Sequence, residues 1–190
     1  MITRMPLNRC MWQATADSNS FSYIDYLAVG EIPVGPHCGA FGHVRTNHTH
    51  EGIDLYGNTD DTVYSMNDGV VIWINPLTGE QVGSPWWHNT LAIGVFTGTH
   101  TWVYGEVAPL EHIEMGTVVK SGDALAKLVP VLKKDKGRPM TMLHVELYDG
   151  YVPDCIRTWP TDAPLPPGNL IDPTPYLLKH IEDKYEQSSS

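Results

Sequence analysis

The stretch His-Thr-His-Glu-Gly-Ile-Asp-Leu-Tyr-Gly at residues 48–57 carries side chains that could bind a metal ion. His50 and Glu51 begin like the His-Glu-x-x-His motif of zinc-binding helices, but Asp54 stands where the second histidine belongs. Gly52 and the β-favouring residues that follow it argue against a helix. On a strand, His50, Gly52 and Asp54 share one face, and the missing side chain at Gly52 leaves room for an ion. The pattern therefore predicts two metal ligands, an imidazole and a carboxylate.

An ordinary hydrogen bond between the same histidine and aspartate on a sheet surface would explain this pattern equally well. A third ligand would favour the metal, and His144 is the candidate, although a lone histidine in a strand is more often structural. It lies in an alternating segment, residues 140–150, with aliphatic residues on one face and polar residues on the other. The aliphatic face comprises Leu143, Val145 and Leu147, and the other face comprises Met142, His144 and Glu146.

The rest of the chain predicts a strand-rich domain that could position these ligands. Short apolar runs separated by Asn-Asp-Gly and Gly-Thr-His turns predict hairpins over residues 62–76 and 91–107. A Gly-Asp turn within residues 115–132 leads into a further strand. A Pro-rich surface loop is expected over residues 153–168, followed by a short helix over residues 172–187.

Composition excludes several classes of function. The net charge of −10 and the lack of a basic patch beyond one short lysine cluster argue against nucleic-acid binding. No apolar run approaches the length of a membrane span, and no signal peptide is recognisable. The three cysteines, Cys10, Cys38 and Cys155, have no metal-ligand spacing, and both a Cys38 disulfide and unpaired thiols remain open.

Three segments together resemble the lysostaphin-type zinc endopeptidases. They are HEGIDLYGNTDDTVYSMNDGVVIW, VYGEVAPLEHIEMGTVVKSGDALAKL and MLHVELY, in the order and spacing of that family. The resemblance runs from Gly35 to Leu178. It implies a mainly β fold, an antiparallel sheet or barrel-like domain with long loops and a short C-terminal helix. It divides the chain into an irregular N-terminal arm (1–34), a peptidase domain (35–178) and a C-terminal tail (179–190).

By this resemblance His50, Asp54 and His144 are the three ligands of a Zn²⁺ ion, with the fourth position open for water and substrate. Members of the family cut peptide cross-links in bacterial peptidoglycan. The chain departs from the family at two catalytic histidines, which are replaced by Glu106 and Met142. A methionine cannot accept a proton.

Glu106 is the candidate catalytic base, because a carboxylate beside a metal site can take a proton from water. On a regular strand it would share a face with Trp102 and Tyr104, whose rings could desolvate it. The alternative roles for Glu106 are a surface residue or a partner that orients His144. Tyr-Gly-Glu-Val and Met-Leu-His resemble a subgroup of bacteriophage and bacterial relatives, whereas a vertebrate chemotaxin branch that also lacks a catalytic histidine has no evident peptidase activity.

The candidate substrate contacts are Tyr104, Arg45, His48 and Met142, and Arg45 could instead form a structural ion pair. The loop residues His88 and His100 and the pair Trp86-Trp87 are expected to line or flank a groove.

The expected function is a zinc-dependent endopeptidase, phage-encoded, that acts in cell-wall lysis or entry. It would reside in a virion or be released to the bacterial cell wall or periplasm. The expected partners are peptidoglycan peptides and other virion proteins, with no nucleic acid and no membrane. The alternatives are an inactive zinc-binding module of the same fold, as a virion component or binding protein, and an amidase or esterase that uses the same site.

Overall fold

The structure is a computed structural model that describes residue 2 and residues 4–8, 32–35, 37–134, 140–155 and 158–188. Nine strands, one short 3₁₀ helix and one α-helix follow one another along this part of the chain. They are β1 (Ile53–Tyr56), β2 (Thr62–Tyr64), β3 (Gly69–Thr78), η1 (Glu80–Val82), β4 (Thr90–Phe96), β5 (His100–Pro109), β6 (Val118–Val119), β7 (Ala124–Leu128), β8 (Met142–Asp149), β9 (Leu170–Ile171) and α1 (Thr174–Ser188).

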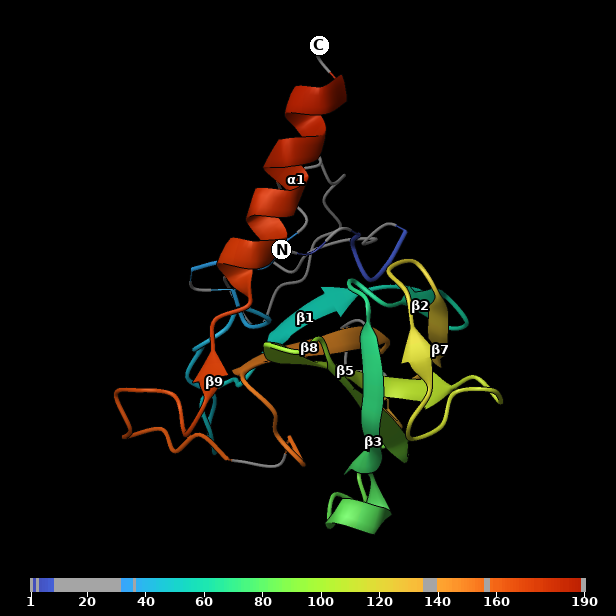
Figure 1. Ribbon diagram of the computed structural model, residues 1–190. Helices are drawn as coiled ribbons and strands as arrows, with labels where there is room; N and C mark the ends of the chain where they lie inside the picture. Colours follow the sequence, from blue (N-terminus) through green and yellow to red (C-terminus); the bar gives the residue numbers. More distant parts are fainter. Residues whose placement is uncertain are drawn as a thin grey trace.

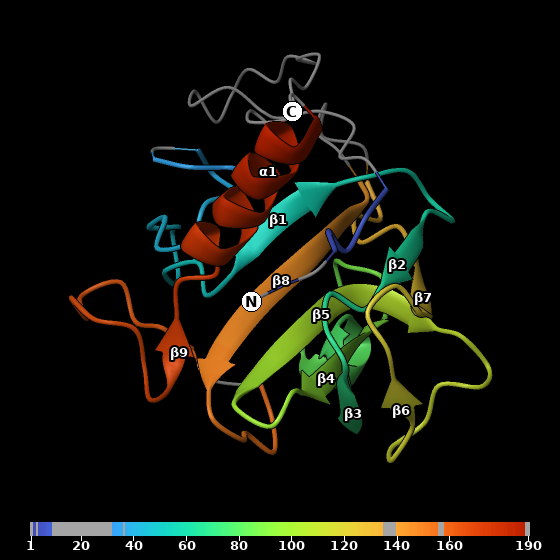
Figure 2. The same ribbon diagram turned by 45° about the horizontal axis from the view of Figure 1, so that its top comes forward.

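The strands form one antiparallel sheet that curls but does not close (Figures 1 and 2). Its main path runs β1-β8-β5-β4-β3-β6, while β2 pairs with β7, β7 also pairs with β5, and β9 pairs with β8. The expected mainly β fold with a C-terminal helix is confirmed. Helix α1 continues past residue 178, where the tail was expected to begin, and the predicted domain boundaries stay a prediction. Among the described residues, no helix is long and apolar enough to cross a membrane.

One predicted hairpin is confirmed and the other is wrong. Strands β4 and β5 pair across the turn that contains Thr97 and His100, as expected. Strands β2 and β3 do not pair with each other, because the turn between them is attached elsewhere. The carboxylate of Asp68 accepts hydrogen bonds from the Lys120 ammonium at 2.8 Å and from the Ser121 backbone N–H at 2.9 Å. These bonds, together with the backbone bonds of Ser65 to Gly122 and Asp123, hold the turn against the β6–β7 connection, and β2 pairs with β7.

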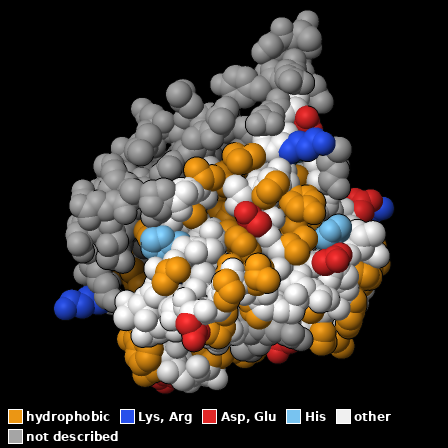
Figure 3. All heavy atoms as spheres, turned by 90° about the vertical axis from the view of Figure 1, so that its left-hand side faces the viewer, with side chains coloured by type: hydrophobic (Ala, Val, Ile, Leu, Met, Phe, Trp, Pro, Cys, Tyr) orange, Lys and Arg blue, Asp and Glu red, His pale blue; other side chains and the backbone are white. Residues whose placement is uncertain are grey.

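The two faces of β8 both pack inward, for different reasons. Leu143, Val145 and Leu147 are fully buried in the main hydrophobic core, which confirms the predicted alternation. The opposite face lies under a second apolar cluster that includes Val152, Cys155, Trp159 and Leu170. The Pro-rich segment is therefore not only a surface loop, because its apolar side chains cover the polar face of β8. Figure 3 views the molecule from the side that carries β9 and the loop before it, and apolar side chains gather there among a few acidic and histidine side chains.

Cys38 and Cys155 are free thiols, and Cys10 lies outside the described residues. Most of the expected N-terminal arm and part of the lysine cluster also lie outside them.

Candidate metal centre

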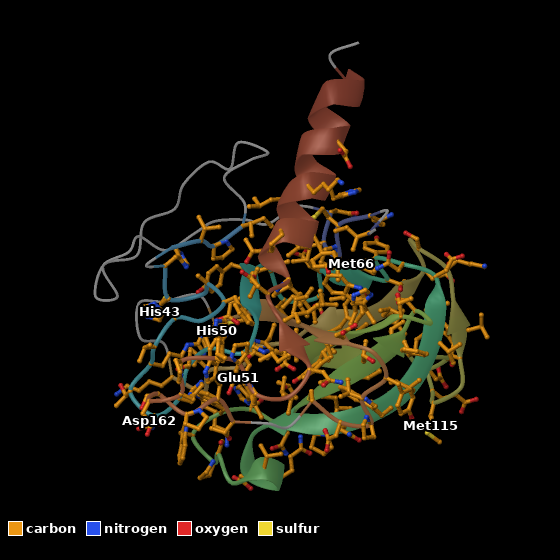
Figure 4. The ribbon with its side chains drawn as sticks, turned by 60° about the vertical axis from the view of Figure 1, so that its left-hand side comes forward. His43, His50, Glu51, Met66, Met115 and Asp162 are labelled. Carbon is orange, nitrogen blue, oxygen red and sulfur yellow. The ribbon has the colours of Figure 1, made fainter. Side chains whose placement is uncertain are left out.

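Two histidines and an aspartate come together where the segment before β1 meets β8. His50 Nε2 lies 3.1 Å from Asp54 Oδ1 and 3.1 Å from His144 Nδ1, and His144 Nδ1 lies 3.0 Å from Asp54 Oδ1. All three residues are buried. Figure 4 shows His50 in the same part of the molecule as His43 and Glu51, with Met115 on the far side. The three predicted ligands therefore lie in one cluster.

The pairing of β1 with β8 creates this cluster, because Asp54 stands directly opposite His144 in the antiparallel register. His50 precedes the strand, which begins only at Ile53, so it is not placed by a continuous strand as predicted. Its backbone N–H instead donates to the carbonyl of His43 at 2.9 Å, across a small turn closed by a bridge between Val44 and Thr49.

Gly52 leaves space for the His144 ring, whereas the sequence predicted that it would leave space for the ion. A Cβ atom at this position would overlap the carbonyl oxygen of Val145 and lie 2.8 Å from Cε1 of His144. The absent side chain therefore admits the His144 ring itself, together with the β8 backbone, rather than an ion. The requirement for glycine comes from close packing of the two strands.

Hydrogen bonds on the outer side of each histidine fix which ring nitrogen faces the cluster. Nδ1 of His50 lies 2.9 Å from the carbonyl oxygen of Ala40, which can only accept, so Nδ1 carries the proton. Nε2 of His144 donates to Oε1 of Glu146 at 3.0 Å, and the Tyr148 hydroxyl donates to Oε2 of the same carboxylate at 2.7 Å. His50 Nε2 and His144 Nδ1 therefore face the cluster as candidate metal-ligand atoms, as in histidines that bind metals.

The electrostatics of the cluster suit a bound cation. Burial lowers the pKa of His50 to about 4, so its ring is neutral near neutral pH. Burial would raise the pKa of Asp54, but His50 and Arg45 hold it well below its usual range. Burial would lower the pKa of His144, but its hydrogen bonds to Asp54 and Glu146 raise it well above the usual value. A metal would therefore displace a proton from His144, and the other two ligands are already in their binding forms.

The donor set and its dimensions fit a zinc ion. Zinc takes imidazole nitrogen and carboxylate oxygen at about 2.0–2.1 Å, which places neighbouring ligands of a tetrahedron about 3.3 Å apart. The three donors lie within 4.8 Å of one another, and the hydrogen-bonded pairs lie at 3.0–3.1 Å. A small outward movement of each donor would accommodate the ion, with three protein ligands and an open fourth position.

Glu106 lies beside this cluster because of a β-bulge in β5. Leu91 of β4 pairs with Val107, and Ala92 pairs with Gly105, so Glu106 is the extra residue between them. Its φ angle of 65° is unusual for a residue other than glycine. Such bulges redirect a side chain. Burial and the charge of Asp54 raise the pKa of Glu106 to about 8.

Comparison with known proteins identifies the fold. No protein-family model matches the sequence, and no curated protein matches it. The structure of the antimicrobial peptidase lysostaphin from Staphylococcus simulans matches with a TM-score of 0.52 at 15% sequence identity, over 83% of this chain and 52% of that chain. LytU matches with a TM-score of 0.50 at 21% identity, over 82% of this chain and 89% of that chain. The fold is the lysostaphin-type peptidase fold.

Within this lysostaphin-type fold, two cavities of about 410 and 460 Å³ lie against the metal cluster. Arg45, His48, Trp87 and Glu106 line both cavities, so the two spaces meet at the cluster. Met142 lines the larger one. These four residues and Met142 therefore border the open space beside the cluster.

Arg45 and His48 differ in how they are held. Arg45 Nη2 donates to Asp54 Oδ2 at 2.7 Å and to the Cys38 carbonyl at 3.0 Å, so the predicted alternative of a structural ion pair is present. His48 is about one-third exposed, and its Nε2 lies 3.9 Å from a Glu51 oxygen. His48 therefore lies at the partly exposed edge of both cavities, and its role as a substrate contact stays a prediction.

Tyr104 lies apart from the site, and the prediction that Glu106 shares a face with Tyr104 and Trp102 is wrong. Tyr104 is fully buried in the main core, where its hydroxyl accepts the Met66 backbone N–H at 2.9 Å. Trp102 packs in the same core. The bulge turns Glu106 to the other side of the sheet, the side that carries His144. His100 likewise lies elsewhere, beside Tyr176 of α1.

Sequence reasoning missed two groups that hold the cluster in place. The Tyr148 hydroxyl orients Glu146, and the two-residue spacing of these side chains on an alternating strand was a usable signal. Trp87, from the Trp-Trp pair expected to line or flank a groove, lines both cavities. The Ala40 carbonyl gave no signal, because a backbone acceptor leaves no mark in the residue type.

We predict that Gly52→Ala weakens metal binding, because the added methyl group displaces the His144 ring. The expected loss of zinc affinity is about tenfold or more, the range seen when the support of a ligand is disturbed. Competition with a chromophoric chelator measures it. Gly39→Ala is the matched control, since its Cβ would lie 3.2 Å from the nearest atoms, Asp54 Cβ and the Tyr56 hydroxyl, and should cost less. Equal losses in the two variants, both folded, would contradict this role of Gly52.

We also predict that Glu106→Gln stabilises the metal-free protein in a pH-dependent manner. The folded-state pKa of about 8 lies above the ordinary 4.5, so the folded protein holds this proton more tightly than the unfolded chain. That stabilisation is complete below about pH 4.5 and is lost as the pH rises towards 8. At pH 8 the variant should therefore unfold at a higher temperature than the parent, and its free energy of unfolding should be larger by on the order of a few kcal/mol. Near pH 4 the two proteins should unfold at similar temperatures. Glu111→Gln, at an exposed position, should show no such trend.

Proposed function

We propose that this protein is a zinc-dependent endopeptidase that hydrolyses peptide bonds in bacterial peptidoglycan. The observation that carries the proposal is the cluster of His50, Asp54 and His144, with donor atoms 3.0–3.1 Å apart, beside a partly buried carboxylate. The lysostaphin-type fold and the two cavities that meet at the cluster support it.

In this proposal the three clustered residues hold the metal, and the chain supplies the proton transfers. Zinc supplies a Lewis acid that polarises the scissile carbonyl and lowers the pKa of water. Ala40 and Glu146 orient the two imidazoles through their outer nitrogens.

Glu106 is the proposed general base. It takes a proton from the attacking water and returns it to the leaving amine, so that the carboxylate is restored after each turnover. Its Oε2 atom is buried, and no hydrogen bond reaches it from the described residues. A partly buried carboxylate with one oxygen that accepts no hydrogen bond and with a raised pKa is suited to exchange a proton near neutral pH.

The residues around the base have proposed supporting roles. Met142 contributes an apolar surface to the same cavity and has no proton to give, so both proton transfers are assigned to Glu106. His48 faces the substrate from the segment that leads into His50, where its ring N–H can donate to peptide carbonyl or carboxylate oxygens. Arg45, on the same segment, is held by Asp54 and the Cys38 carbonyl. Tyr104 has no substrate contact in this proposal, because it lies in the core.

The proposed setting is the bacterial cell wall, with the enzyme encoded by a phage and acting in lysis or entry. The support for this setting is the resemblance of Tyr-Gly-Glu-Val and Met-Leu-His to the phage-like subgroup. Stem or cross-bridge peptides are the proposed substrates, and virion proteins are the proposed partners.

A second candidate is a zinc-binding module of the same fold without catalysis, and one observation favours it. Met142 stands at a position where a proton donor would be expected from the family resemblance, and it cannot provide one. In this case the metal would stabilise the domain, and the cavities would bind wall peptides without cleaving them.

The two candidates differ in what Glu106→Gln changes. If the protein is an enzyme, the zinc-loaded parent releases peptides from purified peptidoglycan, and the variant loses about 100- to 10,000-fold in rate while keeping its zinc. Mass spectrometry of the digests and metal analysis by atomic emission measure the two quantities. Glu111→Gln is the matched control and should keep full activity.

His144→Ala should lose both zinc and cleavage, because it removes one of three ligands. Stoichiometric zinc with no cleavage of walls from several bacteria would favour the module. A parent protein that binds no zinc at all would end both proposals.

A further inference from the structure

The two oxygens of Asp54 have different partners. Oδ1 faces the cluster, where it lies 3.1 Å from His50 Nε2 and 3.0 Å from His144 Nδ1. Oδ2 faces away and accepts the Arg45 guanidinium at 2.7 Å. One oxygen of the carboxylate can therefore bind a metal, while the other already accepts a hydrogen bond from Arg45.

The guanidinium is held in place from a second direction. Arg45 Nη2 also donates to the Cys38 carbonyl at 3.0 Å, and the Arg45 backbone N–H donates to the His48 carbonyl at 2.9 Å. The Asp54 backbone N–H donates to the Gly39 carbonyl at 2.9 Å. Both members of the ion pair are therefore tied to the loop that leads into His50, and neither can rotate away without breaking further hydrogen bonds.

This arrangement matters because a carboxylate can bind a metal through one oxygen or through both. A catalytic zinc site keeps a fourth position open for water and substrate, with three protein ligands. If Asp54 bound through both oxygens, the protein would supply four donor atoms and crowd that position. A charge-assisted hydrogen bond of 2.7 Å competes directly for the second oxygen.

We propose that Arg45 is a positioning residue that holds Asp54 as a one-oxygen metal ligand and so keeps a coordination position open for substrate. The inference rests on the proposed function only in assigning that position to substrate. The role differs from a direct substrate contact, since Arg45 acts through Asp54. It also explains why a cation lies next to a metal site, where its charge alone would weaken metal binding.

Cobalt substitution tests the proposal, because visible absorption of Co²⁺ is strong at four coordination and weak at five or six. The parent protein loaded with one equivalent of Co²⁺ should show the strong spectrum. Arg45→Met, which keeps an unbranched, flexible side chain but removes the charge and the N–H donors, should show a spectrum weakened several-fold at the same cobalt content. Arg45→Lys should retain part of the intensity, because an ammonium can still reach Oδ2.

Thr46→Ala is the matched control, since Thr46 is an exposed neighbour in the same loop and makes no described contact with Asp54. Its spectrum should equal that of the parent. X-ray absorption of the zinc-loaded proteins gives the coordination number independently, with an increase expected only in Arg45→Met. With peptide substrates, kcat of this variant should fall about 10- to 100-fold with little change in KM.

An Arg45→Met protein with one bound metal, an unchanged cobalt spectrum and an unchanged coordination number would overturn the proposal. So would a variant that folds, by circular dichroism, but binds no metal, since Arg45 would then control affinity rather than geometry. If the spectra change as expected while the parent cleaves no peptidoglycan, the assignment of Arg45 stands and the proposed enzyme function fails. If the parent cleaves peptidoglycan but the cobalt spectrum of Arg45→Met equals that of the parent, the proposed enzyme function stands and the assignment of Arg45 fails.

Discussion

The register between β1 and β8 is the constraint on which the metal centre depends. It sets Asp54 opposite His144, and it requires the bare backbone of Gly52 so that the His144 ring can lie against it. In an antiparallel pair, a slip of one residue would turn Asp54 to the opposite face. The fully buried side chains Ile53, Leu55, Leu143 and Val145 prevent such a slip, since it would expose the whole apolar face. Hydrophobic packing on one face of the sheet therefore fixes the polar chemistry on the other.

Much of this arrangement could be predicted from residue types and spacing. The alternation in β8 placed His144 on a polar face, and the spacing of His50 and Asp54 indicated a ligand pair. The signal in β8 follows from the two-residue period of a strand. His50 instead precedes β1 and reaches the cluster through the turn closed by Val44 and Thr49. The hairpin of β4 and β5 was also predictable, since its turn residues are local.

The features that escaped prediction depend on contacts between distant segments or on breaks in regularity. The position of Glu106 follows from a one-residue bulge, which reverses the face that a regular strand would give it. The neighbour of β2 is β7, a strand about sixty positions further along the chain, and no local signal marks that pairing. The Pro-rich segment was expected at the surface, yet Trp159 packs inward and its backbone N–H donates to Glu51 at 3.0 Å.

That last contact has a consequence for how the protein is made. The loop that carries His50 is clamped by residue 159, through the bond from the Thr49 backbone N–H to the Trp159 carbonyl at 2.8 Å as well as the bond to Glu51. Two of the candidate ligands, His50 and Asp54, are translated about a hundred residues before His144 and Trp159. Contacts of such long range form late and slow folding. A nascent chain therefore holds an incomplete site until residue 159 has been translated, and the three candidate ligands come together only after this long-range contact has formed.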